Sequence, residues 1–467
     1  MTATTAAGAE ALAASEIPSS SLWRIRIGSF LVPVAHAAGM NVVTVLGLRY
    51  LTDSLAISAG TAGLIFALVK IYDGLLDPTV GAMSDRARTR WGRRLPFLFA
   101  GGLAMPLGVV ALFGAPDFGS VLLAELFVTL ALILHATGYT LLTIPGFAMV
   151  VEGSADPHER TRLMAWRVLG NSGGTLIGST LPAWILAALG PGRQGHLAMA
   201  LTIGALVLAA ALGAVLLLRD APRTVPAETP PEAYSLVRQA RLAWRNVPFR
   251  VLTIAHVFLL FGTAVASAGM AYFSRYVLRA GDGWLGTFFM VATVGTVASM
   301  PVWVRLTRVI GKKAGYMAAL AGYGLLNLAW FTATRDEPMA LSAARALGIG
   351  VAAGGMILCA YAMLSDAVRY DFVRNGERRE GAFAGFTTLF DKLSAALALA
   401  AMGWFLAAMG YVPSAGGGAA PQAAGATLAV KLCVTVVPAV AMAAAFVTVS
   451  FYRLDPASLV EAEETAP

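Results

Sequence analysis

The stretch that decides the fold reads Lys70-Ile71-Tyr72-Asp73-Gly74-Leu75-Leu76-Asp77-Pro78, and after it comes the basic loop Asp85-Arg86-Ala87-Arg88-Thr89-Arg90-Trp91-Gly92-Arg93-Arg94. The first part lies in an apolar run, so it places one lysine and two aspartates inside a predicted membrane helix. Each ionisable side chain in hydrocarbon costs roughly 2.5–3.5 kcal/mol on insertion scales, and such residues commonly mark ion or substrate pathways. The stretch therefore predicts a membrane protein that transports a solute.

The composition of the chain agrees with a membrane protein. Of 467 residues, 58% are hydrophobic and only 13% are charged, with a mean hydropathy of +0.71, so the chain lacks the polar surface of a soluble globule. The net charge of +8 does not indicate nucleic-acid binding, because the basic residues form short clusters between apolar runs. Cys359 and Cys433 lie in apolar segments and indicate neither a disulfide nor a metal site.

Apolar windows long enough to cross a bilayer can be placed twelve times along the chain. A proline-rich polar segment separates six of them from the other six, which predicts an all-α membrane protein with two six-helix bundles. We expect a cytoplasmic tail over 1–25 without a cleaved signal, bundles over 26–218 and 250–452, a cytoplasmic linker over 219–249 and a tail over 453–467. The expected spans are 27–51, 57–82, 96–114, 120–150, 163–189, 197–218, 250–279, 285–305, 314–333, 339–364, 381–410 and 424–451.

Basic residues predict the orientation, because cytoplasmic loops carry an excess of Lys and Arg. They gather in the loops after the second, fourth, eighth and tenth spans, whereas the loops on the opposite side of the membrane have few. This pattern places both termini in the cytoplasm. A weak repeat relates residues 85–94 to residues 304–313, each after the second span of its half. Two related six-span halves with substrate bound between them are the architecture of major facilitator transporters.

These motifs together resemble the glycoside-pentoside-hexuronide:cation symporters, the family of melibiose permease. The resemblance covers nearly the whole chain, and its members share a cytoplasmic-membrane location and cation-coupled import. The residues that carry it are Asp73-x3-Asp77-Pro78-x2-Gly81-x3-Asp85, Arg90-x-Gly92-Arg93-Arg94-x-Pro96, Ile144-Pro145 to Glu152, Glu159-Arg160, Arg167, Asp366-x3-Tyr370-x7-Arg378-Arg379-Glu380-Gly381-x10-Lys392, and Gly410-Tyr411-Val412-Pro413.

Lys70, Asp73 and Asp77 are spaced to share one helix face, and two close carboxylates in a low dielectric readily bind a proton or a cation. The alternative is a buried pair that only fixes helix packing. The resemblance implies that Asp73 and Asp77 hold the coupling ion and that Thr140 adds an oxygen. Leu76 replaces an amide of sodium-using relatives, which favours H+ and leaves Na+ open.

The resemblance also implies a cytoplasmic charge network that gates the transporter. The charged residues of the basic loop 85–94 could instead serve only to orient the protein in the membrane. The expected gating residues are Asp85, Arg86, Arg93, Arg94, Glu152, Arg160, Asp366, Arg378, Arg379 and Glu380.

The expected substrate site departs from that of galactoside-transporting relatives, because the two sugar-binding acids are replaced by Ala37, beside His36, and by Thr143. The remaining basic residues would suit an anionic substrate, such as a hexuronate or a charged lipid headgroup. Each polar or aromatic residue could instead serve helix packing. The candidate substrate residues are Arg167, Lys392, Asp391, Thr143, Phe147, His36, Trp166 and Tyr139.

The sequence therefore predicts symport of a sugar, glycoside, uronide or similar organic solute with H+ or Na+ by alternating access. The alternatives are a lysolipid or other amphipathic-solute carrier on the same fold, and a non-transporting membrane sensor. We expect no enzyme, since no nucleophile and base pair, metal cluster or phosphate-binding loop can be named. The expected partners are a small molecule and the lipid bilayer, with no nucleic acid and no cofactor besides the coupling ion, in a monomer.

Overall fold

The computed structural model describes residues 19–152, 156–219, 221, 244–335, 337–375 and 380–454. These residues form helices and no strand, apart from one isolated antiparallel bridge between Leu55 and Ala415. In chain order the elements are α2 (Ser19–Asp53), α3 (Ala59–Arg86), α4 (Leu95–Phe113), α5 (Val121–Glu152), α6 (Pro157–Leu189), α7 (Arg193–Leu218), α9 (Val247–Tyr272), the π-helix η1 (Phe273–Val277), α10 (Asp282–Ile310), α11 (Lys312–Ala329), the 3-10 turn η2 (Trp330–Thr332), α12 (Met339–Asn375), α13 (Glu380–Ala408), α14 (Ala424–Val434) and α15 (Val436–Ser450).

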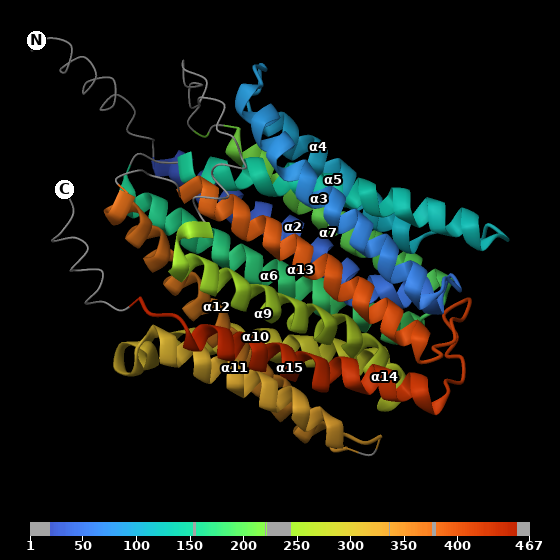
Figure 1. Cartoon of the computed structure of the whole chain (residues 1–467). Helices are drawn as coiled ribbons and strands as arrows, with labels where there is room; N and C mark the ends of the chain where they lie inside the picture. Colours follow the sequence, from blue (N-terminus) through green and yellow to red (C-terminus); the bar gives the residue numbers. More distant parts are fainter. Residues whose placement is uncertain are drawn as a thin grey trace, which may run out of the picture.

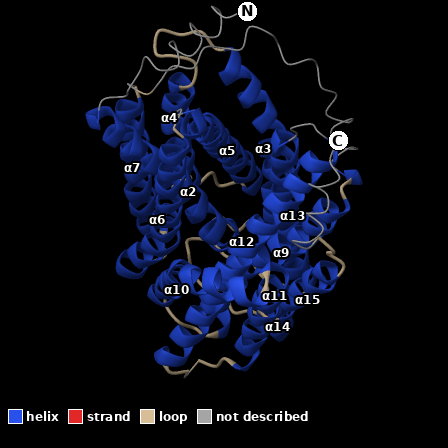
Figure 2. Cartoon of the chain, turned by 90° about the vertical axis from the view of Figure 1, so that its left-hand side faces the viewer, coloured by secondary structure: helices blue, strands red, loops and turns tan. Residues whose placement is uncertain are grey.

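The helices run roughly parallel and antiparallel along one direction (Figure 1). The start of α2 and the end of α15 lie at the same end of the molecule, on the left in that view. Figure 2 shows α2–α7 and α9–α15 as two groups, here called the N-terminal and C-terminal bundles. Helices α3 and α13 contact each other across the two bundles, as do α6 and α10.

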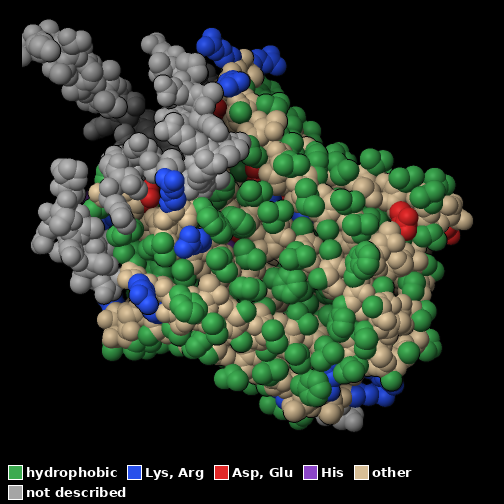
Figure 3. Space-filling view, in the orientation of Figure 1, with side chains coloured by type: hydrophobic (Ala, Val, Ile, Leu, Met, Phe, Trp, Pro, Cys, Tyr) green, Lys and Arg blue, Asp and Glu red, His purple; other side chains and the backbone are tan. Residues whose placement is uncertain are grey.

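Eleven helices of the described part are long and apolar enough to cross a membrane. They match eleven of the twelve expected spans. The remaining one corresponds to α11, whose 18 residues begin with Lys312 and Lys313 and include Asn327, so that its apolar stretch is short. On the face shown in Figure 3, hydrophobic side chains are widespread between the two ends and charged side chains are few, as a lipid-facing surface requires.

The last expected span is interrupted between α14 and α15. Thr435 has φ −109° and ψ −71°, and its hydroxyl donates to the carbonyl of Lys431 at 2.7 Å. Pro438 follows three residues later, and because proline has no backbone N–H, it cannot continue the hydrogen-bond pattern of α14. The predicted range 424–451 therefore contains two consecutive helices.

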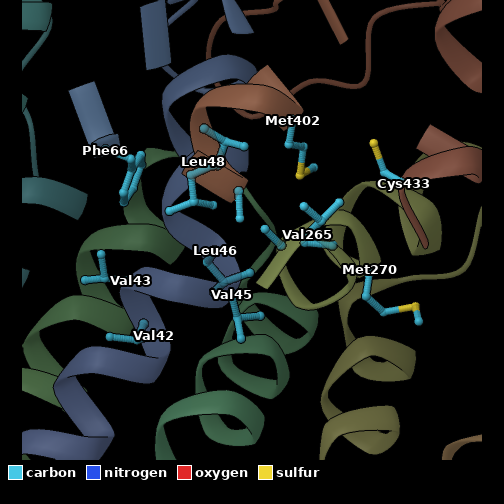
Figure 4. Close-up of a cluster of buried hydrophobic side chains, with 14 of the residues drawn as sticks. Val42, Val43, Val45, Leu46, Leu48, Phe66, Val265, Met270, Met402 and Cys433 are labelled. Carbon is cyan, nitrogen blue, oxygen red and sulfur yellow. The ribbon is translucent and has the colours of Figure 1, made fainter. Parts of the chain in front are cut away.

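A continuous apolar core extends across both bundles. Figure 4 shows Leu48 of α2, Val265 of α9 and Met402 of α13 close to one another, and all three are buried. Packing of this kind, rather than hydrophobic burial alone, is what holds helices together in lipid. Cys433 belongs to the same cluster, and both cysteines are free and buried, as expected from their apolar segments.

The contact between α3 and α13 depends on two glycines. A Cβ at Gly403 would lie 2.3 Å from the carbonyl oxygen of Ala59, and one at Gly63 would lie 2.6 Å from that of Leu399. The two backbones therefore touch where the bundles meet, and small residues are required there.

Gly403→Ala is expected to lower the thermal unfolding midpoint of the purified protein, because overpacking costs about 1–3 kcal/mol. Gly385→Ala is the matched control on α13, since a Cβ at Gly385 meets nothing within 4 Å. Alanine is the better helix former, so the control should keep or raise the midpoint. Equal midpoints for the two variants would contradict the close contact.

Candidate functional site

Two aspartates of α3 meet one lysine of α13 across the two bundles. Lys392 Nζ lies 3.0 Å from Asp73 Oδ1 and 2.7 Å from Asp77 Oδ2, and it donates to the Asp73 carbonyl oxygen at 2.9 Å. From α5, the Thr140 hydroxyl lies 2.8 Å from Asp73 Oδ1 and 2.9 Å from Asp77 Oδ1. Asp73 and Thr140 are almost fully buried. The predicted triad of Asp73, Asp77 and Thr140 is thus brought together.

Lys70 completes what we call the Asp73 cluster, which comprises Lys70, Asp73, Asp77, Thr140 and Lys392. Its Nζ lies 3.8 Å from Asp73 Oδ2, one turn along α3. With both carboxylates ionised and both amines protonated, these side chains sum to zero charge. Lys392, a candidate substrate residue, lies against the two aspartates.

Local sequence explains this geometry. The i, i+3 and i+7 spacing places Lys70, Asp73 and Asp77 along one face of α3. Gly74, between the two aspartates, faces the Lys392 stem, and a Cβ there would make ordinary van der Waals contact with Lys392 Cδ at 3.7 Å. Pro78 follows directly and removes one backbone donor from α3, which weakens the helix next to the cluster.

Arg167 contacts Phe147 and lies within electrostatic range of Tyr139, and Tyr139 adjoins the Asp73 cluster. The guanidinium carbon of Arg167 lies 4.7 Å from the centre of the Phe147 ring, a cation–π contact. Arg167 Nη1 is buried without a hydrogen-bond partner among the described residues. The Tyr139 ring lies 6.0 Å from Lys70 Nζ and 5.8 Å from Lys392 Nζ. Tyr139 therefore adjoins the Asp73 cluster itself.

His36 packs edge-on against Tyr139, with ring centres 5.7 Å apart. It is 4% exposed, and within the described part of the chain its Nε2 has no hydrogen-bond partner. Two buried nitrogens without partners, on His36 and Arg167, thus lie on the N-terminal bundle near Tyr139. They are suited to an oxygen-rich ligand, because a buried donor left unpaired costs about 1–3 kcal/mol.

Three other candidate substrate residues have different surroundings. The Thr143 hydroxyl donates within α5, to the Tyr139 carbonyl at 2.8 Å. Trp166 packs edge-on against Trp23 and Phe30 of α2, at 5.5 Å and 6.0 Å. Asp391 Oδ1 lies 3.0 Å from His256 Nε2 of α9. Trp166 is thus held in an aromatic cluster, and Asp391 lies in the C-terminal bundle.

The candidate gating residues form contacts within each bundle. Arg94 Nη2 lies 3.1 Å from Asp85 Oδ1 in the N-terminal bundle. Lys312 Nζ lies 2.8 Å and 2.6 Å from the two Asp366 oxygens in the C-terminal bundle. The side chains of Arg86 and Arg160 are exposed, whereas Arg93 is half-buried. Arg378 and Arg379 lie outside the described residues, as do the side chains of Glu152 and Glu380.

The sequence analysis did not predict an ion pair between Arg26 and Glu159 in the N-terminal bundle. Arg26 Nε and Nη2 donate to the two carboxylate oxygens of Glu159, each at 2.7 Å, and so join the start of α2 to the start of α6. Bidentate pairs of this kind are geometrically specific. Glu159 had been noted as part of a family motif without a named partner.

A second buried ionic site lies at the opposite end of the molecule. Asp53, at the end of α2, is 1% exposed and accepts from the hydroxyls of Thr52 and Tyr276, each at 2.9 Å, and from that of Tyr411. Arg275 Nη1 lies 3.5 Å from its Oδ2. We call these five residues the Asp53 cluster. Since Arg275, Tyr276 and Tyr411 belong to the C-terminal bundle, the cluster joins the two bundles.

The backbone strengthens the same junction. Thr52 and Asp53 accept from the amides of Ser414 and Gly417, at 2.9 Å and 3.0 Å. Gly417 has φ +78°, and a Cβ there would lie 1.9 Å from the Pro191 carbonyl oxygen, so only glycine fits. The loop before α14 is therefore anchored to the loop after α2.

Arg49 makes a further contact between the bundles. This residue of α2 is 3% exposed, and its Nη2 lies 2.6 Å from Asp282 Oδ1 at the start of α10. Its Nη1 donates to the Ala271 carbonyl at 3.3 Å. The sequence analysis missed Arg49 and Asp53, although two opposite charges four residues apart at the end of an apolar span were a usable signal.

Comparisons with known proteins agree with this architecture. The profile of the family described as MFS/sugar transport protein matches residues 28–456. The inner membrane symporter YicJ of Escherichia coli (strain K12) is 27% identical over 392 residues, which cover 81% of this chain and 80% of that protein. The glucuronide carrier protein homolog of the same organism is 27% identical over 442 residues, with 92% of this chain and 93% of that protein covered.

The fold is similar to that of a solved bacterial homolog of the human lysosomal transporter Spinster, in an inward-facing and unoccupied conformation. The TM-score is 0.69 at 15% identity, with 94% of this chain and 100% of that chain covered. The family match spans nearly the whole chain, including every residue of the Asp73 and Asp53 clusters. The chain is therefore a multi-pass membrane transporter, not an enzyme, and belongs to the MFS/sugar transport protein family.

Proposed function

We propose that this transporter imports a sugar, glycoside or uronide together with H+, and that the Asp73 cluster binds the coupling ion. The observation that carries the proposal is the position of Lys392, whose amine bridges Asp73 and Asp77 from the opposite bundle. A proton or cation arriving at the carboxylates must compete with this amine. Ion binding and the contact between α3 and α13 are then coupled.

Protonation of one aspartate would remove half of the negative charge that holds Lys392. Because two close carboxylates in a low dielectric share protons readily, the cluster can take up H+ when it is reached by water from one side and release it to the other. The five side-chain oxygens beside two amines favour H+ over Na+, which needs several oxygens free of competing cations. Release of Lys392 would free the bundles to move relative to each other.

The Asp53 cluster would act as a gate at the opposite end. We propose that this end faces the cell exterior and that both termini are cytoplasmic. We also propose that α11 crosses the membrane, which brings the number of spans to twelve. The basic loops after α3 and before α11 support this orientation. Substrate would bind between the bundles, and rocking would alternately open each end.

An acidic sugar is the cargo that the site favours. Arg167 lies within electrostatic range of Tyr139, which adjoins the Asp73 cluster, and one buried Arg167 nitrogen has no hydrogen-bond partner in the described part of the chain; a guanidinium suits a carboxylate. One E. coli relative is named a glucuronide carrier protein homolog. We therefore propose that a glycoside bearing a carboxylate binds with its charge against Arg167.

The experiment is counterflow in proteoliposomes that contain the full-length protein. Liposomes preloaded with unlabelled solute are tested for uptake of labelled methyl β-D-glucuronide, methyl β-D-glucoside, methyl β-D-xyloside or lysophosphatidylglycerol. We expect uptake of at least one sugar, with the glucuronide preferred. Uptake of the lysolipid alone would establish an amphipathic-solute carrier instead, and uptake of none of the four would favour a non-transporting sensor.

A further inference from the structure

A pocket lies inside the C-terminal bundle, among α9, α11, α12 and α13. Its lining combines apolar side chains with the polar groups of Thr253, His256, Tyr316, Tyr361 and Thr387. The enclosed space has room for about one water-sized group, such as a hydroxyl, next to these polar atoms. Of these five, Thr253, His256, Tyr316 and Thr387 were not identified as functional from the sequence.

Two polar atoms at this pocket lack hydrogen bonds. Tyr316 is 1% exposed, and its hydroxyl has no partner within the described part of the chain. Asp391 follows Phe390 of the lining, and its Oδ1 is buried; His256 Nε2 lies 3.0 Å away but is not aligned for a hydrogen bond. Each unpaired buried group is costly. Helix packing alone gives no reason for two such groups at one pocket.

The pocket adjoins the proposed transport path. Asp391 and Lys392 are consecutive residues of α13, so Lys392 reaches the Asp73 cluster while Asp391 reaches His256. Tyr361, on the pocket wall, is 57% exposed and lies within electrostatic range of both Asp391 and Arg167. A ligand held by Arg167 on one bundle could therefore extend toward this pocket on the other.

We propose that this pocket is a subsite for one hydroxyl group of a sugar ring that binds at its mouth, with Asp391 as acceptor and with His256 and the Tyr316 hydroxyl as the other polar contacts. The proposal rests on the proposed function, and it assigns part of the recognition of the sugar to the C-terminal bundle. The rings of Tyr361 and Phe390 provide apolar surface for the C–H face of the ligand. A bound hydroxyl would satisfy the Tyr316 hydroxyl and the buried Asp391 oxygen.

A subsite built from hydrogen-bonding groups should discriminate strongly against ligands that lack a hydroxyl, because its buried polar atoms are then left unpaired. The ligand class is consequently a polyhydroxylated ring, and an apolar aglycone of equal size should not replace it. Comparison of a sugar with its monodeoxy analogues tests this in the wild-type protein, without any variant.

Tyr316→Phe is the sharpest test, since it removes one oxygen that has no partner in the protein. We expect unchanged or higher thermal stability and a binding affinity for tritiated methyl β-D-glucuronide that is weaker by about tenfold, as one lost hydrogen bond implies. Methyl β-D-glucoside is the second probe. Tyr452→Phe is the matched control, because its hydroxyl is also buried and unpartnered but lies outside the pocket. Equal affinities for Tyr316→Phe and the control would overturn the role of Tyr316.

Asp391→Asn and His256→Gln extend the test to the other two contacts. Both should weaken binding of the same probe at least about tenfold, and Asp391→Asn should reduce the discrimination against one monodeoxy analogue. Asp117→Asn in an exposed loop is the matched control. The wild type could bind and exchange sugar while all three pocket variants keep its affinity and its preference for the sugar over the monodeoxy analogues. In that case the proposed subsite is wrong and the proposed function stands. If the wild type binds neither probe and exchanges neither, both proposals fail.

Discussion

Asp77→Asn is expected to abolish sugar accumulation driven by an imposed pH gradient. With a gradient of about two pH units, one-to-one coupling supports about 100-fold accumulation, since each 1.4 kcal/mol corresponds to a factor of ten. An amide cannot take up a proton, and Asp77 provides one of the two carboxylates that hold Lys392 between the bundles. The variant should therefore equilibrate sugar without concentrating it.

The measurement is uptake of labelled methyl β-D-glucuronide into proteoliposomes with and without the gradient. Sugar counterflow serves as the internal control, because exchange needs no net movement of the ion and should persist in the variant. Asp117→Asn is the matched control, since Asp117 lies exposed in the loop before α5, away from the Asp73 cluster. Full accumulation by Asp77→Asn would show that the coupling ion binds elsewhere.

Asp53→Ala is expected to open the end of the molecule that lies away from the termini. The variant leaves Arg275 without its carboxylate partner and removes the acceptor of the Tyr276 and Tyr411 hydroxyls. Removing one partner of a buried ion pair costs about 3–5 kcal/mol. Because the Asp53 cluster joins the two bundles, the substitution destabilises the conformation in which that end is closed.

The readout is labelling of an engineered cysteine, Thr44→Cys, by a membrane-impermeant maleimide. Thr44 lines the pocket that holds Lys70 and Asp73, and the native cysteines are buried. We expect the labelling rate to rise about tenfold or more when Asp53→Ala is added to Thr44→Cys. Asp117→Ala, an exposed carboxylate at the same end, is the control and should leave the rate unchanged. Equal rates in the two double variants would rule out the Asp53 cluster as a gate.

Much of the fold could be predicted from the sequence, because hydropathy and length alone determine which segments can cross a bilayer. Eleven of the expected spans are apolar helices of sufficient length. The division of the last span at Thr435 was not predictable from Pro438, since prolines such as Pro106 and Pro301 lie inside uninterrupted helices. The short apolar stretch of α11 was harder to judge, because two lysines in its first turn and a buried Asn327 lower its hydropathy.

The Asp73 cluster was predictable only in its local part. Lys70, Asp73 and Asp77 share one helix, so their spacing placed them together. The position of Lys392 depends on how α13 docks against α3, 319 residues away in the chain. Sequence spacing carries no information on such docking, and the lysine was therefore assigned to the substrate instead of to the carboxylates.

The Asp53 cluster and the Tyr316 pocket were missed for a similar reason. Asp53 was treated as a residue of an ordinary loop, and its partners come from η1 and from the loop after α13. His256 and Tyr316 are single polar residues in apolar helices, a pattern that usually reflects packing. Only the packed structure reveals that Tyr316 has no partner for its hydroxyl.

The central claim is that sugar and proton cross together through the Asp73 cluster. The most direct test is to record external pH while methyl β-D-glucuronide is added to weakly buffered, Na+-free proteoliposomes that contain the full-length protein. The account predicts external alkalinisation that follows sugar uptake in the wild type and disappears in Asp77→Asn. Sugar uptake by the wild type without alkalinisation, or alkalinisation that persists in Asp77→Asn, would contradict it.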